Sequence, residues 1–171
     1  DIERPQAKKT EYVGKLKSKK LGFQVMILST PYRGRAIPFS FTTYRTIDTQ
    51  LSSRNMEHGK AIGELKELLG DKILVLDREF SYEGMLEEMV HAGIHFRLNT
   101  GNKVNILNES GGKVSLSVGI GEEVHYRGVY YKGNIEVNIS DKWEKGFLEP
   151  IWVMTSEEPE KGMEIYSIED R

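Results

Sequence analysis

The stretch KILVLDREFSYEGMLEEMVHAGIHFRL, Lys72 to Leu98, decides the fold of this chain because two apolar segments in it are separated by an amphipathic one. Lys72 to Leu76 has the length and composition of a short buried strand, and Ile94 to Leu98 has the same character. Between them, Tyr82 to His91 has helical spacing and is closed by Gly93, a residue type that commonly ends helices. A strand, a helix and a strand in this order predict two adjacent parallel strands joined by a crossover, and therefore an α/β fold.

The segment upstream predicts an antiparallel hairpin. Phe23 to Thr30 is a continuous apolar run of strand length, Ala36 to Tyr44 is a second run, and the basic, turn-rich link Pro31 to Arg35 separates them. Pro38 removes a backbone donor from the second run, so this strand is expected at the edge of a sheet. We expect the hairpin to share one sheet with the two parallel strands.

The segment from Ser52 to Gly70 predicts the clearest helix of the chain. Its apolar residues recur at helical spacing, a serine can cap its start, and Gly70 can end it. The expected buried stripe of this helix consists of Ala61, Ile62, Leu65, Leu68 and Leu69.

From Lys103 to Phe147 the pattern changes to the alternation that is typical of β-strands, and we interpret this segment as an all-β insertion. The alternating residues are Val114, Leu116, Val118 and Ile120, then Ile135, Val137 and Ile139, with Gly111-Gly112 and Lys132-Gly133-Asn134 as expected turns. Ile151 to Met154 resumes a buried strand. A last helix is expected to begin at Pro159 and to continue through Met163, Ile165, Tyr166 and Ile168.

Composition limits the class of protein. The 171 residues suffice for one compact domain, possibly with an insertion, and 38% hydrophobic with 29% charged residues is the profile of a folded globular chain. The lack of cysteine excludes disulfides and thiolate zinc sites. No run approaches the roughly 18 apolar residues that would cross a bilayer, and the first residues do not resemble a cleavable signal. We therefore expect no membrane partner and a cytoplasmic location. Since the chain opens at Asp1 without an initiating methionine, we also expect further sequence upstream.

Charge is distributed unevenly along the chain. Residues 1–60 contain 12 Lys and Arg against 5 Asp and Glu, a net charge of +7, whereas residues 61–171 carry a net charge of −9. A basic segment is typical of a phosphate-binding surface, because phosphate contacts supply most of the sequence-independent affinity for nucleic acid. A solvated surface explains the same charge, and from charge alone it is the simpler interpretation.

Asp77 is the most informative candidate residue because it ends a strongly apolar strand. Ligands of open α/β sheets collect beyond the carboxyl ends of such strands. A cation such as Mg²⁺ prefers carboxylate oxygens, and two cations about 4 Å apart can activate a nucleophile and stabilise a leaving phosphate oxygen. The alternative is that Asp77 caps the following turn, and the residues alone leave both interpretations open.

Several segments, in the right order, resemble insertion-sequence DDE transposases. VLDREFSYEGMLEEMVHAGIHFRLNTG, Val75 to Gly101, is similar to the block around the second catalytic aspartate of that family. RPQAKKTEYVGKLK, Arg4 to Lys17, with PYRGRAIPF, Pro31 to Phe39, looks like the stretch after the first catalytic aspartate. IWVMTSEEPEKGMEIYSIEDR, Ile151 to Arg171, looks like the approach to the family's Tyr-Arg-Glu-Lys signature. These segments are distributed over essentially the whole chain, from Arg4 to Arg171, and together they are more specific than one short motif.

This resemblance implies a ribonuclease-H-like α/β fold, in which a mixed sheet flanked by helices is interrupted by the β-rich insertion 103–147. Residues 1–171 would form part of the catalytic domain. It implies metal-dependent DNA strand cleavage and strand transfer at the ends of the element, with three carboxylates holding two Mg²⁺ or Mn²⁺ ions. The implied partner is double-stranded DNA, at the element ends and at the target, and a homodimer on DNA is a candidate assembly.

The resemblance also assigns site residues. Asp77 corresponds to the second catalytic aspartate and metal ligand, and Asp1 is either the first one or lies a few residues downstream of it. Tyr166 and Arg171 correspond to the signature, although the family's arginine follows its tyrosine by three residues and Glu169 stands there. The catalytic glutamate is then expected beyond Arg171, so the chain alone is expected to be inactive. The alternative is a non-catalytic DNA-binding or interaction remnant of a decayed element.

Other residues give weaker signals. Basic residues near these segments are candidate phosphate contacts, with solvent exposure as the equally simple alternative: Lys8, Lys9, Lys15, Arg33, Arg35 and Arg78. His91 and His95 have i, i+4 spacing, but Gly93 separates them, so surface or core histidines are favoured over a zinc site. Trp143 and Trp152 are expected in the core.

Overall fold

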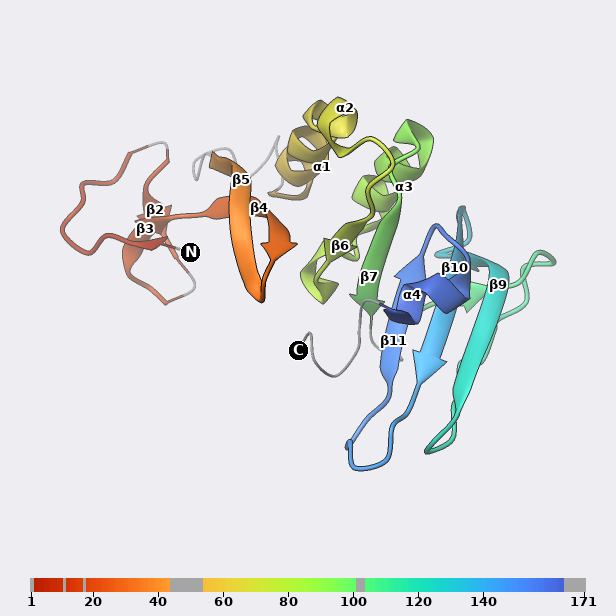
Figure 1. Cartoon of the computed structure of the whole chain (residues 1–171). Coiled ribbons are helices and arrows are strands. Elements are labelled where there is room, and N and C mark those ends of the chain that lie inside the picture. The colour runs from red at the N-terminus through yellow and green to blue at the C-terminus, as the bar shows by residue number, and fades with distance from the viewer. Residues whose placement is uncertain (1, 11, 17, 44–53, 101–103, 165–171) are drawn as a thin grey trace. The chain divides into compact units, whose positions relative to one another are not determined.

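The computed structural model describes residues 2–10, 12–16, 18–43, 54–100 and 104–164 of the chain (Figure 1). The chain divides into two units, Asp1–Ala61 and Ile62–Arg171. Two small β-sheets lie in the first unit, and a six-stranded mixed sheet with helices lies in the second. The protein is therefore a mixed α/β protein, as the sequence predicts at this level.

The first unit begins with a small antiparallel sheet that the sequence analysis did not predict. Its strands are β1 (Ile2–Glu3), β2 (Gly14–Lys15) and β3 (Leu21–Phe23), in the order β1-β3-β2. These strands have two or three residues each, too few for a visible alternation of apolar side chains. Gly22 occupies the central strand, where a Cβ atom would lie 2.3 Å from the carbonyl oxygen of Ile2 and 2.4 Å from Cδ1 of Leu16. The close approach of the strands therefore requires glycine at this position.

The predicted hairpin is confirmed. Strands β4 (Val25–Tyr32) and β5 (Arg35–Thr43) pair antiparallel along their whole length. The turn residues Arg33 and Gly34 both have positive φ, at +50° and +70°, which suits the right-handed twist of a two-residue hairpin loop. Pro38 lies in an edge strand as predicted, and the pairing register shifts beside it, which accommodates its missing donor.

The prediction that the hairpin shares one sheet with the two parallel strands is wrong. Strands β4 and β5 form a two-stranded sheet of their own, whereas the two parallel strands belong to the six-stranded sheet. Met26 and Leu28 are buried on one side of β4, but Ile27 and Phe41, on the other side of the hairpin, are 57% and 76% exposed. An apolar run identifies a strand without specifying its neighbour, because pairing depends on contacts distant in sequence.

The predicted helix Ser52–Gly70 is divided into α1 (Arg54–Glu64) and α2 (Lys66–Leu69). At Leu65 the backbone N–H donates to the carbonyl of Ile62 (3.1 Å), an i→i−3 bond that tightens the chain. The apolar sides of the two helices therefore do not form one continuous stripe. Leu68, which was expected on the buried stripe, is 62% exposed. The expected serine cap lies outside the described residues. None of the helices within residues 54–92 and 159–164 is long and apolar enough to cross a membrane.

The six-stranded sheet of the second unit has the order β6-β7-β11-β10-β9-β8. Its strands are β6 (Leu74–Leu76), β7 (Phe96–Thr100), β8 (Ile106–Leu107), β9 (Glu123–Tyr131), β10 (Ile135–Lys142) and β11 (Ile151–Thr155). Strands β6 and β7 pair parallel, with Leu76 opposite Leu98, and the other pairs are antiparallel. The predicted parallel pair is confirmed, and so is the buried strand at Ile151.

The crossover between the parallel strands is helix α3 (Glu83–Ala92). Met85, Leu86 and Met89 are buried along one side of it. Gly93 ends the helix in the left-handed conformation (φ +67°, ψ +28°), and its N–H donates to carbonyls of the last turn. The predicted helix and its glycine cap are therefore both confirmed.

Within the described part of the β-rich segment, residues 104–147 form strands and turns without a helix. Strand β10 pairs with β9 on one side and with β11 on the other, so β9 and β10 continue the sheet that contains β6 and β7. The predicted strand over Val114–Ile120 is wrong. The hydroxyl of Tyr126 accepts from the N–H of Ser117 (3.0 Å) and donates to its carbonyl (3.1 Å), so a side chain replaces a backbone ladder there.

Helix α4 (Pro159–Glu164) begins at the predicted proline and lies across β10 and β11 in Figure 1. Gly162 faces β10 and β11, and a Cβ atom there would make ordinary contacts, 3.4 Å from Thr155 and 3.6 Å from Val153. Met163 packs into a buried cluster with Ile151 and Val153. The expected continuation of the helix through Ile165, Tyr166 and Ile168 lies outside the described residues.

We predict that Gly22→Ala destabilises the first unit by about 1–3 kcal/mol, because the added methyl group overlaps backbone and Leu16. The control is Gly63→Ala on α1, where nothing lies within 4 Å and alanine should stabilise by about 0.5–1 kcal/mol. Hydrogen exchange of peptides containing β3 measures the effect, while fluorescence of Trp143 and Trp152 reports on the second unit. Unchanged exchange in Gly22→Ala would contradict the packing described.

Candidate functional site

Asp77 follows β6 directly, and its exposed carboxylate lies at the end of that strand. Its Oδ1 accepts from the N–H of Arg78 (2.6 Å), and its carbonyl accepts from the N–H of Phe80 (2.9 Å). Asp77 is thus the N-cap of the short 3₁₀ helix η1 (Arg78–Phe80). The capping interpretation is therefore correct for one carboxylate oxygen. Within the described part of the chain, Oδ2 has no hydrogen bond, so it is available to a ligand.

The surroundings of Asp77 are set by the parallel pairing. Because Leu76 lies opposite Leu98, Asp77 is level with Asn99 at the carboxyl ends of both parallel strands. The loop that follows is anchored from the far side of the sheet, since the buried Tyr131 on β9 donates its hydroxyl to the carbonyl of Ser81 (2.6 Å). This anchor restrains the chain four residues after Asp77.

The described residues do not by themselves form a metal centre. No group of three or more His, Asp or Glu side chains that could hold a metal ion occurs among them. Asp77 alone supplies at most two oxygens, whereas Mg²⁺ takes six ligands. Asp1, Tyr166 and Arg171 lie outside the described residues. A cation at Asp77 would therefore need carboxylates from beyond the described part of the chain.

A buried ion pair lies one strand away from Asp77. Arg97 on β7 is 3% exposed, and its Nη2 is 3.0 Å from Oε2 of Glu157, which follows β11. The only sequence signal for this pair is a charged residue inside the apolar run IHFRL. Because the Arg97 side chain is buried and pairs with the loop after β11, this ion pair joins β7 to the end of β11, while Glu157 remains partly exposed.

A serine, a histidine and a glutamate also come together on β9 and β10. Nδ1 of His125 is 3.1 Å from Oγ of Ser140, and its Nε2 is 3.4 Å from Oε1 of Glu123. These residue types serve in nucleophilic catalysis when the hydroxyl can reach a substrate. Ser140, however, has no exposed surface, and its hydroxyl donates to the carbonyl of Pro159 at the start of α4. The arrangement therefore stabilises the packing of α4 and is not a hydrolase site.

Asp141 on β10 is a buried acid that the sequence analysis missed. It has no exposed surface, and neither of its carboxylate oxygens has a hydrogen-bond partner in the part of the chain that the structure describes. Its cross-strand neighbour on β11 is the buried Trp152. Loss of hydration on burial raises the pKa of Asp141 from 3.8 to about 7.

The remaining candidate residues are dispersed. His91 and His95 are both exposed, and Nδ1 of His91 is 2.8 Å from the carbonyl oxygen of Glu87 on its own helix. Trp152 is buried as predicted, while Trp143 is only half-buried and donates its indole N–H to the carbonyl of Phe147 (3.0 Å).

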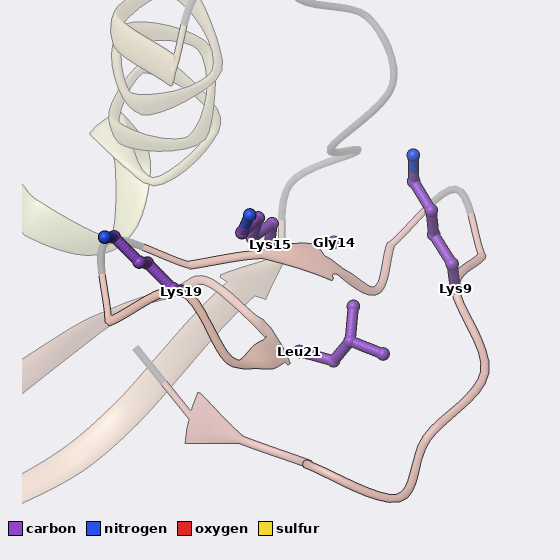
Figure 2. Close-up of a pocket in the computed structure, with 5 residues that line it drawn as sticks. All are labelled: Lys9, Gly14, Lys15, Lys19 and Leu21. Carbon is purple, nitrogen blue, oxygen red and sulfur yellow. The ribbon is translucent and has the colours of Figure 1, made fainter.

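The candidate phosphate contacts lie on η1, at the hairpin turn and around β2. Arg78 is exposed on η1, and Arg33 and Arg35 flank the hairpin turn, with the guanidinium of Arg33 5.2 Å from the ring centre of Tyr32. Lys8 is exposed in the loop before β2. Lys9 and Lys15 line one pocket together with Lys19, which the sequence analysis did not single out (Figure 2).

Comparisons of the chain with models of protein families and with curated proteins find no match.

We predict that Asp141 makes the stability of the second unit depend on pH. Between pH 3.8 and about 7, the unfolded chain has lost the proton of this carboxyl group while the folded protein keeps it. The free energy of unfolding therefore falls as pH rises through this window, by about 4 kcal/mol at about 1.4 kcal/mol per pH unit. Asp141→Asn should remove this loss. The free energy of unfolding of the variant minus that of the wild type should therefore be larger at pH 8 than at pH 5.

Urea unfolding followed by tryptophan fluorescence at the two pH values measures the difference. Asp71→Asn, a change of the same kind at an exposed position, is the control and should keep the wild-type dependence on pH. If Asp141→Asn also keeps it, Asp141 is not the titrating group.

Proposed function

We propose that the chain is part of the catalytic domain of an insertion-sequence-type DDE transposase with a ribonuclease-H-like fold. The observation that carries this proposal is the position of Asp77. Its exposed carboxylate stands at the carboxyl end of a strand with a parallel neighbour, one oxygen is held by the following turn, and the other is open. Carboxylates in this position are suited to hold a divalent cation at a sheet edge.

The order of elements around Asp77 supports the proposal. The parallel strands β6 and β7 with their crossover helix α3 form the segment that resembles the second catalytic block. Strand β6 is the last strand of the six-stranded sheet, so no further strand of this sheet covers its outer side. Helix α4 follows β11 where the resemblance puts the approach to the signature.

Each group near Asp77 would have a definite task in this enzyme. Asp77 would bind Mg²⁺ or Mn²⁺ together with carboxylates outside the described residues, and the hydrogen bond from Arg78 would orient it. The bound cations would activate the attacking oxygen and stabilise the leaving oxygen of a phosphodiester. The side chain of Arg78, exposed beside the carboxylate, would hold a DNA phosphate. Such an enzyme would act on chromosomal DNA in the cytoplasm.

A second candidate function is DNA binding without catalysis, as in a remnant of a decayed element. The observation in its favour is that no group of three or more His, Asp or Glu side chains that could hold a metal ion occurs among the described residues. Strand cleavage separates the two functions, because both would bind DNA and only the enzyme would cut it.

We predict that Asp77→Asn abolishes strand cleavage by the protein made from the complete reading frame, with a loss on the order of 10⁴-fold, because metal ligands act as a unit. The assay uses duplex DNA carrying the ends of the encoding element, with Mg²⁺ or Mn²⁺. The control is Asp71→Asn, which removes an equal charge from an exposed turn six positions earlier and should leave cleavage intact. Cleavage by a folded Asp77→Asn protein at the wild-type rate would refute the proposed role of Asp77.

We further predict that the isolated 171-residue chain cleaves no DNA with either metal, because its described residues contain no group of three or more ligands that could hold two cations in place. Agarose-gel nicking of a supercoiled plasmid, with and without EDTA, tests this expectation. Metal-dependent nicking by the isolated chain, abolished by EDTA, would show that its own carboxylates suffice.

A further inference from the structure

A pocket in the first unit gathers three lysines that are separated in sequence. Lys9, Gly14, Lys15, Lys19 and Leu21 line a cavity of 490 Å³, the lysine pocket, and Figure 2 shows its three lysine side chains, whose amine ends are spread apart and do not meet at one point. The lysines come from the loop before β2, from β2 itself, and from the turn between β2 and β3. Nothing in the mechanism proposed for Asp77 uses this pocket.

Two tight turns on either side of β2 build the lysine pocket. Before β2, the N–H of Thr10 donates to the carbonyl of Val13 (3.0 Å), and the N–H of Val13 donates to Oγ1 of Thr10 (3.1 Å). After β2, the N–H of Lys19 donates to the carbonyl of Leu16 (2.9 Å), with Lys19 at φ +65°. The backbone thus returns on itself twice, which brings the lysines on both sides of β2 to the same pocket.

The positive charge of the lysine pocket is not neutralised within the described part of the chain. Lys9, Lys15 and Lys19 have no ion pair there, whereas the neighbouring Lys20 is paired with Glu3 at 2.7 Å. The hydrogen bond from Lys20 lowers the pKa of Glu3. The one acidic group described in this small sheet is therefore already engaged by another lysine. Cations that lie on one surface favour a ligand with several negative charges, because each bound anion reduces their mutual repulsion.

The chemistry of the lining indicates which anion fits. Three ammonium groups offer donors and no acceptor, which suits the oxygens of a phosphate. Among the described residues, no aromatic side chain lines the pocket, so these residues offer no surface on which a base could stack. Gly14 and Leu21 are the other described residues of the lining, and they supply a backbone surface and a small apolar surface. The pocket is therefore built to contact the backbone of a nucleic acid and not to recognise its sequence.

We propose that the lysine pocket binds the phosphodiester backbone of duplex DNA, independently of sequence and through residues other than Asp77. The choice of DNA among phosphate carriers rests on the proposed function, while the phosphate chemistry rests on Lys9, Lys15 and Lys19 themselves. Contact with three phosphates would release about three counterions, which makes the affinity depend on salt.

The test measures binding of a fluorescein-labelled 20-bp duplex to the full chain by anisotropy, in EDTA and over a series of salt concentrations. The triple variant Lys9→Gln, Lys15→Gln, Lys19→Gln should bind at least about tenfold more weakly, and its slope of log affinity against log salt should fall by roughly 2–3. The loss should be equal for two unrelated duplex sequences. The control variant Lys60→Gln, Lys66→Gln, Lys72→Gln removes the same charge from exposed helical and turn positions and should keep the wild-type slope.

Several outcomes would overturn the proposal. These are a pocket variant that binds like the wild type, equal losses in both triple variants, and lysine-dependent binding to phosphatidylserine vesicles without binding to the duplex. If the triple variant is unfolded by circular dichroism, the single variants Lys9→Gln and Lys15→Gln decide the matter, and each should lower the slope by about one. Because binding is measured in EDTA, it does not require catalysis. If Asp77→Asn loses cleavage but the lysine variants bind DNA like the wild type, only the proposal for the lysine pocket is refuted. If Asp77→Asn still cleaves DNA but the lysine variants bind it more weakly, only the proposed role of Asp77 is refuted.

Discussion

The burial of β7 between a parallel and an antiparallel neighbour is the constraint on which the second unit depends. Phe96, Arg97 and Leu98 are each exposed by 3% or less, so both faces of this strand are covered. Its one charge must then be matched inside the protein, because an unpaired buried charge costs several kcal/mol. Glu157 matches it at 3.0 Å, and this pairing holds the chain that leads from β11 into α4.

The same strand sets the position of the candidate catalytic carboxylate. Hydrogen bonding of β6 to β7 decides how far β6 extends, and Asp77 stands at the first residue beyond that pairing. Its cap on η1 turns the chain away from the sheet, and Tyr131 holds the following loop from β9. The cap at Asp77 and the contact of Tyr131 with the following loop thus fix the position of Asp77, whose Oδ2 faces the edge of the sheet without a hydrogen bond in the described part of the chain.

Accessibility separates the charged groups that can meet a ligand from those that only stabilise the fold. Glu123, His125 and Ser140 have the residue types and spacing of a catalytic chain, but burial under α4 removes the hydroxyl from any substrate. Asp141 is buried without a partner in the described region, so its proton affects stability. The lysine pocket and Asp77 differ from both, because their charged atoms face solvent, where a phosphate can replace water.

The sequence by itself determined the local elements. The β4–β5 hairpin, the β6–α3–β7 crossover, the glycine cap at Gly93 and the start of α4 at Pro159 all follow from nearest-neighbour chemistry, namely apolar periodicity and the dihedral preferences of glycine and proline. Only the tertiary structure decided which strands share a sheet, the break at Leu65, and the replacement of a strand at Val114–Ile120 by the Tyr126 contacts. It alone brought Lys19 beside Lys9 and Lys15, and enclosed Arg97 with Glu157. The local sequence around each of these residues does not identify its partner, because the contacts form only when the whole chain has folded.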